Sequence, residues 1–248
     1  MGAPAPRHRA VRAQAGLELR LLLRNPESLL VTLGIPLGVL VFFSVVDILP
    51  VGDDPVAFLV PGVLVISSMG TGLVAVAIQT AFERKYGVLK RIGATPLTHT
   101  GYLMAKGLAV VAMVAFQVVA ILAVAVLFLG WRTNGMVVVA VLGTLLGGFV
   151  FAAIGLWMAG SLKAEMTLAL SNTLFLVLVL VSGLAFDPAS LPGPVAAFAG
   201  LLPSGALGDV LRSALAVPGS VDVVGIVVVF AWGVVATVAA AATFSWEP

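Results

Sequence analysis

The chain has 248 residues, of which 61% are hydrophobic and only 10% are charged. Its 13 Lys and Arg residues and 11 Asp and Glu residues give a formal net charge of +2. A water-soluble domain of this length would need far more polar surface to cover its core. The composition therefore excludes a soluble protein and indicates an integral membrane protein.

Cysteine is absent, which excludes disulfides, thiolate ligands and a catalytic thiol. The only histidines are His8 and His99, and no cluster of carboxylates accompanies either in the sequence. A metal centre or a histidine-based catalytic triad is not expected from this inventory. We therefore predict no catalytic residue, no metal site and no cofactor bound by this chain.

Long apolar runs predict membrane-spanning helices. A helix needs about 20 apolar residues to cross the hydrocarbon core, and the runs here are continuous rather than alternating, unlike the strands of a membrane barrel. The predicted spans lie near residues 28–48, 57–81, 101–129, 135–160, 166–186 and 222–244. The expected fold is an all-α polytopic membrane protein with six transmembrane helices.

Ahead of the first span, residues 7–25 predict an amphipathic helix at the membrane surface. Its basic residues fall within an arc of about 120° on a helical wheel: Arg9, Arg12, Arg20 and Arg24. Its apolar residues occupy much of the opposite side, with Glu18 among them: Val11, Ala15, Leu19 and Leu22. Such a helix rests in the headgroup layer with its cations toward phosphates. A solvated basic tail is the alternative.

Eleven of the thirteen basic residues lie on one side: they precede span one, flank or fill the connection between spans two and three, or lie between spans four and five. Those at the connection between spans two and three are Arg84, Lys85, Lys90, Arg91 and Lys106. Only Arg132 and Arg212 belong to the other side. Because Lys and Arg accumulate in cytoplasmic loops, both termini and the connection between spans two and three are expected in the cytoplasm.

That connection is the most charged stretch of the chain. Gly87 and Gly93 bracket a short helical turn, VLKRI, and Glu83 precedes it, where it orients the loop or pairs with a neighbouring cation. One face is expected to enter an apolar groove of a partner: Val88, Leu89 and Ile92. Lys90 and Arg91 lie beside that face and would meet acidic groups. Thr95, Pro96 and Leu97 end the turn, and Thr98 or Thr100 then caps span three.

The spans carry almost no charge with which to bind a driving ion. The chain also contains no phosphate-binding loop of the form G-x-x-x-x-G-K-[ST]. Energy for active transport would therefore come from a separate subunit, which would act on the charged connection. Polar residues within the spans are the candidates for a substrate path: Ser67, Ser68, Thr71, Gln79 and Asn172.

Between spans five and six, residues 188–216 predict two short helices in a shallow re-entrant hairpin at the outer face. The segment is too apolar for an ordinary loop, while its prolines prevent a single helix. The second helix would bury Leu207, Val210, Leu211 and Leu215. The hairpin residues singled out are Pro188, Pro203, Ser204 as a helix cap, and Asp209 with Arg212 as an i, i+3 pair. An interfacial loop without a transport role is the alternative.

The charged connection resembles the cytoplasmic signature of type-2 ATP-binding-cassette (ABC-2) exporter permeases, which runs roughly E-x-x-x-G-T-L-x-x-L-x-x-T-P-L-S. The matching positions are Glu83, Gly87, Val88, Leu89, Ile92, Thr95, Pro96, Leu97 and Thr98. Val88, Ile92 and Thr98 replace the usual Thr, Leu and Ser. Pro203 and Arg212 are similar to the family's Pro…Arg segment before the last span. The resemblance covers nearly the whole chain.

The resemblance implies one transmembrane domain over residues 1–248 in the bacterial cell membrane. It implies a second permease subunit, identical or homologous, and cytoplasmic ATPase subunits that bind ATP and Mg. Residues 83–97 would contact the ATPase and residues 188–216 would close the outer end. Gly34 and Gly38 would lie at the subunit interface, while Gly143 and Gly147 would serve packing inside the subunit; for either pair the other role stays open.

The expected function is transport of an amphipathic substrate such as a drug, a lipid or a glycolipid. The outer connections are short apart from the hairpin, and the apolar spans carry scattered polar residues. A polysaccharide exporter is one alternative, and an ATP-independent carrier is another. A membrane-embedded enzyme would rely on Ser204 and Asp209, with no basic partner arranged to activate Ser204. The expected partners include membrane lipids but no nucleic acid.

Overall fold

The computed structural model describes residues 6–46, 54–182, 193–216 and 220–246. These residues form helices, and no strand occurs among them. The helices are α1 Arg7–Arg24, α2 Pro26–Leu29, η1 Leu30–Gly34, α3 Ile35–Val45, α4 Pro55–Met69, η2 Gly70–Ala75, α5 Val76–Lys85, α6 Val88–Gly93, α7 His99–Leu127, α8 Val137–Ser161, α9 Ala164–Val181, α10 Gly193–Leu201, α11 Pro203–Ala216 and α12 Val223–Thr243.

Six stretches of the described chain are long and apolar enough to cross a membrane: Pro26–Val45, Pro55–Lys85, His99–Leu127, Val137–Ser161, Ala164–Val181 and Val223–Thr243. The first joins α2, η1 and α3, and the second joins α4, η2 and α5. The predicted all-α polytopic fold with six spans is confirmed.

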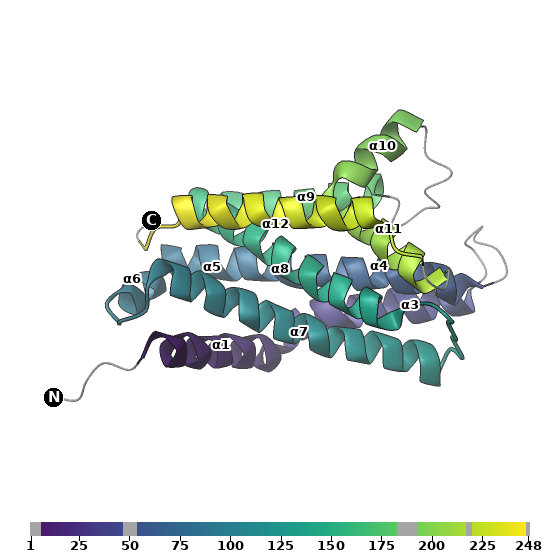
Figure 1. Cartoon of the computed structure of the whole chain (residues 1–248). Coiled ribbons are helices and arrows are strands. Elements are labelled where there is room, and N and C mark those ends of the chain that lie inside the picture. The colour runs from purple at the N-terminus through teal and green to yellow at the C-terminus, as the bar shows by residue number, and fades with distance from the viewer. Residues whose placement is uncertain (1–5, 47–53, 183–192, 217–219, 247–248) are drawn as a thin grey trace.

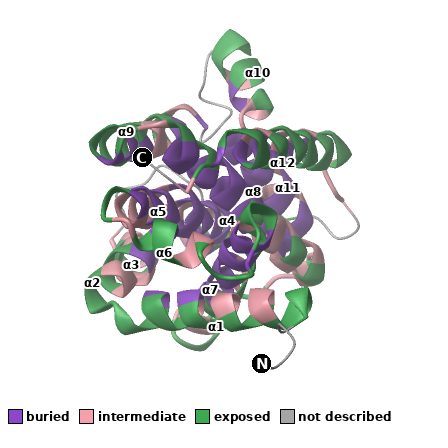
Figure 2. Ribbon diagram, turned by 90° about the vertical axis from the view of Figure 1, so that its left-hand side faces the viewer, coloured by how far each residue is buried: buried purple, intermediate pink, exposed green. Residues whose placement is uncertain are grey.

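The spans lie side by side in one bundle (Figure 1). The start of α1, the short helix α6 and the end of α12 lie together at one end of it, and α10 and α11 lie toward the other (Figure 1). Viewed from the α6 end, α8 runs through the middle and is surrounded by buried residues (Figure 2). Helix α8 contacts η2, α4, α5, α7, α11 and α12, so it is the central element of the core.

Small residues allow the closest helix contacts in this core. A Cβ atom on Gly72 of η2 would lie 2.7 Å from the backbone nitrogen of Ala152 in α8. A Cβ on Gly155 would lie 2.6 Å from the carbonyl oxygen of Gly72. The backbones of spans two and four therefore touch, as small residues permit in membrane helices.

Helix α1 lies across one side of the bundle (Figure 2) and packs on α7. Its apolar side faces that helix, with Leu22 beside Ala109 and Met113. The predicted basic residues are exposed: Arg9, Arg12, Arg20 and Arg24. The turn after α1 follows from Asn25, whose side chain accepts a hydrogen bond from the Ser28 amide, and from Pro26 in the first turn of α2.

Helices α10 and α11 meet at an angle of 94° around Leu202. Helix α11 buries the expected residues Leu207, Val210, Leu211 and Leu215. Its leucines fill the surface that Gly143 and Gly147 leave on α8, where a Cβ on Gly147 would lie 2.3 Å from Leu207. The second glycine pair thus packs inside the subunit.

The polar residues of the hairpin have mixed outcomes. Asp209 and Arg212 form the predicted ion pair, at 2.7 Å. Ser204 was predicted to cap α11, and this is wrong, because α11 begins at Pro203 and Ser204 lies within its first turn, where its buried hydroxyl pairs with the Ser182 hydroxyl at the end of α9. Pro188 lies outside the described residues.

Candidate functional site

The connection between the second and third spans is the short helix α6, held between two tight turns. Gly87 has a φ of +71°, a left-handed conformation that a Cβ disfavours. After α6, the Thr98 side chain accepts a hydrogen bond from the Gly101 amide at 3.1 Å and so caps α7. Gly87 and Thr98 therefore mark the two ends of the connection.

Contrary to the prediction, the apolar side chains of α6 are not all exposed to a partner. Leu89 is fully buried and packs with Leu97, Tyr102 and Phe244, so it is not available to a partner. Leu89 packs inside its own subunit because α6 lies against Tyr102 at the start of α7. Val88 is 41% exposed and Tyr86, which was not singled out, is 69% exposed.

The same packing decides which of the remaining connection residues are buried and which are exposed. Ile92 is half-buried and Leu97 is buried, whereas Lys90, Arg91, Thr95 and Pro96 are exposed. The surface open to a partner therefore combines Tyr86 and Val88 with the basic pair that follows. We refer to Tyr86, Val88, Lys90 and Arg91 as the α6 outer face.

The C-terminal segment braces α6 from behind. The rings of His99 and Trp246 lie 4.7 Å apart, and those of Tyr102 and Phe244 lie 5.5 Å apart. A Cβ on Gly93 would lie 3.0 Å from the Trp246 indole. Residues more than 140 positions apart thus form one aromatic cluster beneath α6, and no local sequence signal indicates this contact.

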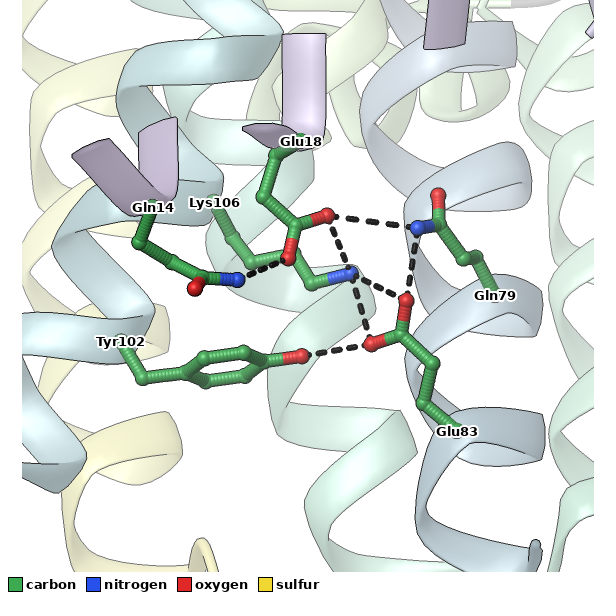
Figure 3. Close-up of polar contacts among 6 residues, drawn as sticks. All are labelled: Gln14, Glu18, Gln79, Glu83, Tyr102 and Lys106. Carbon is green, nitrogen blue, oxygen red and sulfur yellow. Dashed lines mark hydrogen bonds and ion pairs between the residues drawn. The ribbon is translucent and has the colours of Figure 1, made fainter. Parts of the chain in front are cut away.

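A charged cluster lies inside the bundle near the same end (Figure 3). The Lys106 Nζ atom is 2.8 Å from a carboxylate oxygen of Glu18 and 2.9 Å from one of Glu83. Glu18 and Lys106 are buried, and the Glu83 side chain is 16% exposed. The three residues come from α1, α5 and α7, so this cluster ties those helices together.

Neutral groups complete the cluster (Figure 3). Gln14 donates to Glu18 at 2.7 Å, and Gln79 donates to Glu18 at 3.2 Å and to Glu83 at 2.7 Å. The Tyr102 hydroxyl donates to Glu83 at 2.7 Å. Two carboxylates share one ammonium, and these donors stabilise the second negative charge, which would be costly if it were buried without partners.

The structure corrects three expectations about charged residues near the connection. Lys106 was expected to flank the loop, but α7 begins at His99 and carries Lys106 about two turns into the bundle. Arg84 was also counted with the loop, and it is buried and donates to the Gly160 and Leu162 carbonyls at the end of α8. Glu83 has the predicted cation partner, but it faces inward rather than toward a docking subunit.

One sequence signal could have located the cluster. Glu18 was noted among the apolar residues of the amphipathic helix, and an acid on a buried face requires a cationic partner. Lys106 lies in an otherwise apolar run that begins after the third-span cap. Matching these two isolated charges would have predicted the contact between α1 and α7.

A cleft of about 810 Å³ opens between the first two spans, with the end of α1 at one side. It is lined along η1 and η2 by Val31, Thr32, Gly70, Val74 and Ala75. Its polar lining includes two of the predicted path residues, Gln79 and Asn172.

The other three path candidates do not line this cleft. Ser67, Ser68 and Thr71 are buried in the interior of the subunit. The Ser68 hydroxyl bonds to the Val65 carbonyl of its own helix, and Thr71 bonds to Gln117 of α7. Their assignment to an open path is wrong in this conformation, because they lie on the side of span two that packs against other helices.

A side chain at Gly34 or Gly38 would meet no other helix in the described part of the chain. A Cβ on Gly34 would meet only Leu30, one turn earlier in the same span, and one on Gly38 would meet nothing within 4 Å. Packing inside the subunit therefore does not explain this pair, and the expected contact with a second permease stays a prediction.

Within the described residues, no group of three or more His, Cys, Asp or Glu side chains is placed to hold a metal ion. The fold is that of a multi-pass membrane domain with a connecting helix exposed at one end.

The family model of ABC-2 type transporters matches residues 11–216. Because this match covers most of the chain, the protein belongs to the ABC-2 type transporter family. The matching domain is the membrane-spanning permease component, and the family implies association with separate ATPase subunits. No curated protein matches the chain.

Proposed function

We propose that the protein is the permease subunit of an ATP-driven exporter for an amphipathic substrate such as a drug, a lipid or a glycolipid. Two permease subunits would form the path, and cytoplasmic ATPase subunits would bind ATP and Mg. The observation that carries the proposal is the α6 outer face, a rigidly held surface with two exposed apolar side chains beside two cations.

Movement of α6 would reach the spans by two routes. Leu89 joins α6 to the start of α7 through the aromatic cluster with Tyr102 and Phe244. Glu83, one turn before α6, joins α5 to α7 and α1 through Lys106. These contacts make α1, α5, α6 and α7 one body at this end, so a partner that displaces α6 would displace both spans and the surface helix together.

The cleft supports an amphipathic substrate. Its volume of about 810 Å³ is in the range of small-molecule sites. Arg24, Asn25 and Glu27 line it where α1 turns into the first span, while Val31, Val74 and Ile78 line its apolar part. The polar group of an amphipathic substrate would contact the polar lining, and its apolar part would contact the apolar lining.

We also propose that the α6 end faces the cytoplasm of a bacterial cell. Most Lys and Arg residues belong to the segments at that end, as the positive-inside rule requires of cytoplasmic loops. This orientation presents the α6 outer face to a cytoplasmic ATPase and α10 and α11 to the outside.

The test is to purify the tagged protein in mild detergent from its native cells, identify associated proteins by mass spectrometry and assay ATP hydrolysis. Val88→Asp places a charge on the α6 outer face, which a bound ATPase would bury. We therefore expect this variant to lose the ATPase from the complex. Val223→Asp is the matched control, because Val223 is an exposed first residue of α12 at the other end of the bundle.

An associated ATPase that is lost with Val88→Asp and kept with Val223→Asp would support the proposal. Wild-type ATP-driven transport by the Val88→Asp variant would overturn the role of the α6 outer face. A protein that transports without any associated ATPase would be an ATP-independent carrier, contrary to the proposal.

A further inference from the structure

The first two spans each contain a π-helical segment where they line the cleft. In η1 the Ile35 amide bonds to the Leu30 carbonyl, and in η2 the Val76 amide bonds to the Thr71 carbonyl, both five residues apart. The two segments contact each other. Such segments are rare and disturb the regular backbone hydrogen bonds, so they need support from neighbouring groups.

One buried side chain from a third span supports both segments. Gln117, near the middle of α7, donates from Nε2 to the Thr32 carbonyl in η1 at 3.0 Å. The Thr71 hydroxyl of η2 lies 2.8 Å from Nε2 and 3.1 Å from Oε1 of the same amide. A single amide thereby joins spans one, two and three.

Pro36 removes the regular α-helical partner of the Thr32 carbonyl. In a regular α-helix, the carbonyl of residue 32 accepts from the amide of residue 36, and proline has no N–H to donate. An unpaired carbonyl at membrane depth is costly, and neighbouring helices are the usual source of a replacement donor. Gln117 provides that donor from a residue 85 positions away.

We propose that Gln117 is the positioning residue of the cleft: its amide holds η1 and η2, which form the cleft walls, at one separation. Gln117 does not line the cleft itself, so it acts through Thr32 and Thr71. In the proposed exporter, the separation of these walls would determine which substrates fit, and this consequence rests on the proposed function. The positioning role itself does not.

The absence of native cysteines allows a direct measurement of the walls. Val31→Cys places one thiol on η1, where Val31 is 50% exposed, and Phe42→Cys places a reference thiol on the same span beyond η1, where Phe42 is 54% exposed. The rate of modification by a membrane-permeant maleimide is measured for each thiol in the intact complex. Each thiol is combined with Gln117→Leu, Thr71→Val, Thr71→Ser or Thr144→Val.

Gln117→Leu and Thr71→Val should change the rate at residue 31 by about two- to tenfold, the shift in equilibrium that one lost hydrogen bond gives. The rate at residue 42 should not change. Thr71→Ser keeps the hydroxyl and should restore the wild-type rate. Thr144→Val is the control, because Thr144 is equally buried in a span but its hydroxyl bonds only to Ala140 of its own helix.

Thr71→Val preserves the shape of the side chain, so it tests the inference even if Gln117→Leu fails to fold. An unchanged rate at residue 31 in folded Thr71→Val protein would overturn the positioning role. Transport of amphipathic dyes of two sizes is measured on the same variants. A changed rate with unchanged discrimination between the dyes would overturn the cleft as the substrate site and leave the positioning role supported.

Discussion

At the level of single residues, the contrast between two lysines shows which charges the fold depends on. Lys85 pairs with Glu165 on the surface, where both side chains are largely exposed. Lys106 is buried between Glu18 and Glu83, and its side chain is only 1% exposed to solvent. Water and salt weaken the first pair, whereas loss of the ammonium in the second leaves two carboxylates facing each other.

We predict that Lys106→Met destabilises the protein by about 3–5 kcal/mol, the usual cost of removing one partner from a buried ion pair. The measurement is the unfolding midpoint in detergent. Lys85→Met should cause only a small shift, and adding Glu18→Gln to Lys106→Met should restore part of the loss. Equal midpoints for Lys106→Met and Lys85→Met would contradict the structural role of the charged cluster.

At the level of elements, α6 is too short to hold its own conformation. A helix of this length is unstable in isolation, so its order comes from Leu89 on one side and from the C-terminal aromatic residues beneath it. In the proposed coupling role the brace would matter, because a flexible connection would absorb the displacement that a partner applies.

Gly93→Val tests the brace, since its Cβ alone would lie 3.0 Å from Trp246. We predict that it displaces the C-terminal segment and makes amide hydrogen exchange in α6 about tenfold faster, which equals about 1.4 kcal/mol of local stability. Gly16→Val is the control, because a Cβ on Gly16 meets nothing within 4 Å. Unchanged exchange in α6 after Gly93→Val would show that the aromatic contact does not order this helix.

At the level of the whole molecule, the two glycine pairs have different surroundings. Gly143 and Gly147 of α8 face the leucines of α11, while Gly38 faces open space on the first span. The same local pattern thus serves packing inside the subunit in one case and leaves an accessible surface in the other. An assembly of two permeases would use the accessible surface.

We predict that Gly38→Leu weakens self-association or pairing with a homologous permease by at least about tenfold, because a large side chain separates the two backbones. Native mass spectrometry of the detergent-solubilised complex measures the fraction with two permeases. Gly147→Leu should instead lower the unfolding midpoint, since its side chain would collide with Leu207. A wild-type fraction of paired permeases with Gly38→Leu would exclude this face from the interface.

Features that depend on neighbouring residues in the chain could be predicted from the sequence. Apolar runs long enough to cross a bilayer predicted the six spans. Gly87 and Thr98 predicted the ends of the α6 connection, and the spacing of Asp209 and Arg212 predicted their ion pair. Hydrophobicity, local backbone preferences and the spacing of charges along one helix are sufficient for these features.

Contacts between distant segments required the tertiary structure. Val88 and Leu89 are adjacent apolar residues of one short helix. Leu89 is buried because it packs with Tyr102 and Phe244, whereas Val88 is exposed. The same is true of Lys106 with Glu18 and of Gln117 with Thr32, which are 88 and 85 positions apart. A polar residue in an apolar run shows that a partner is needed, but the packing of the helices determines which residue that partner is.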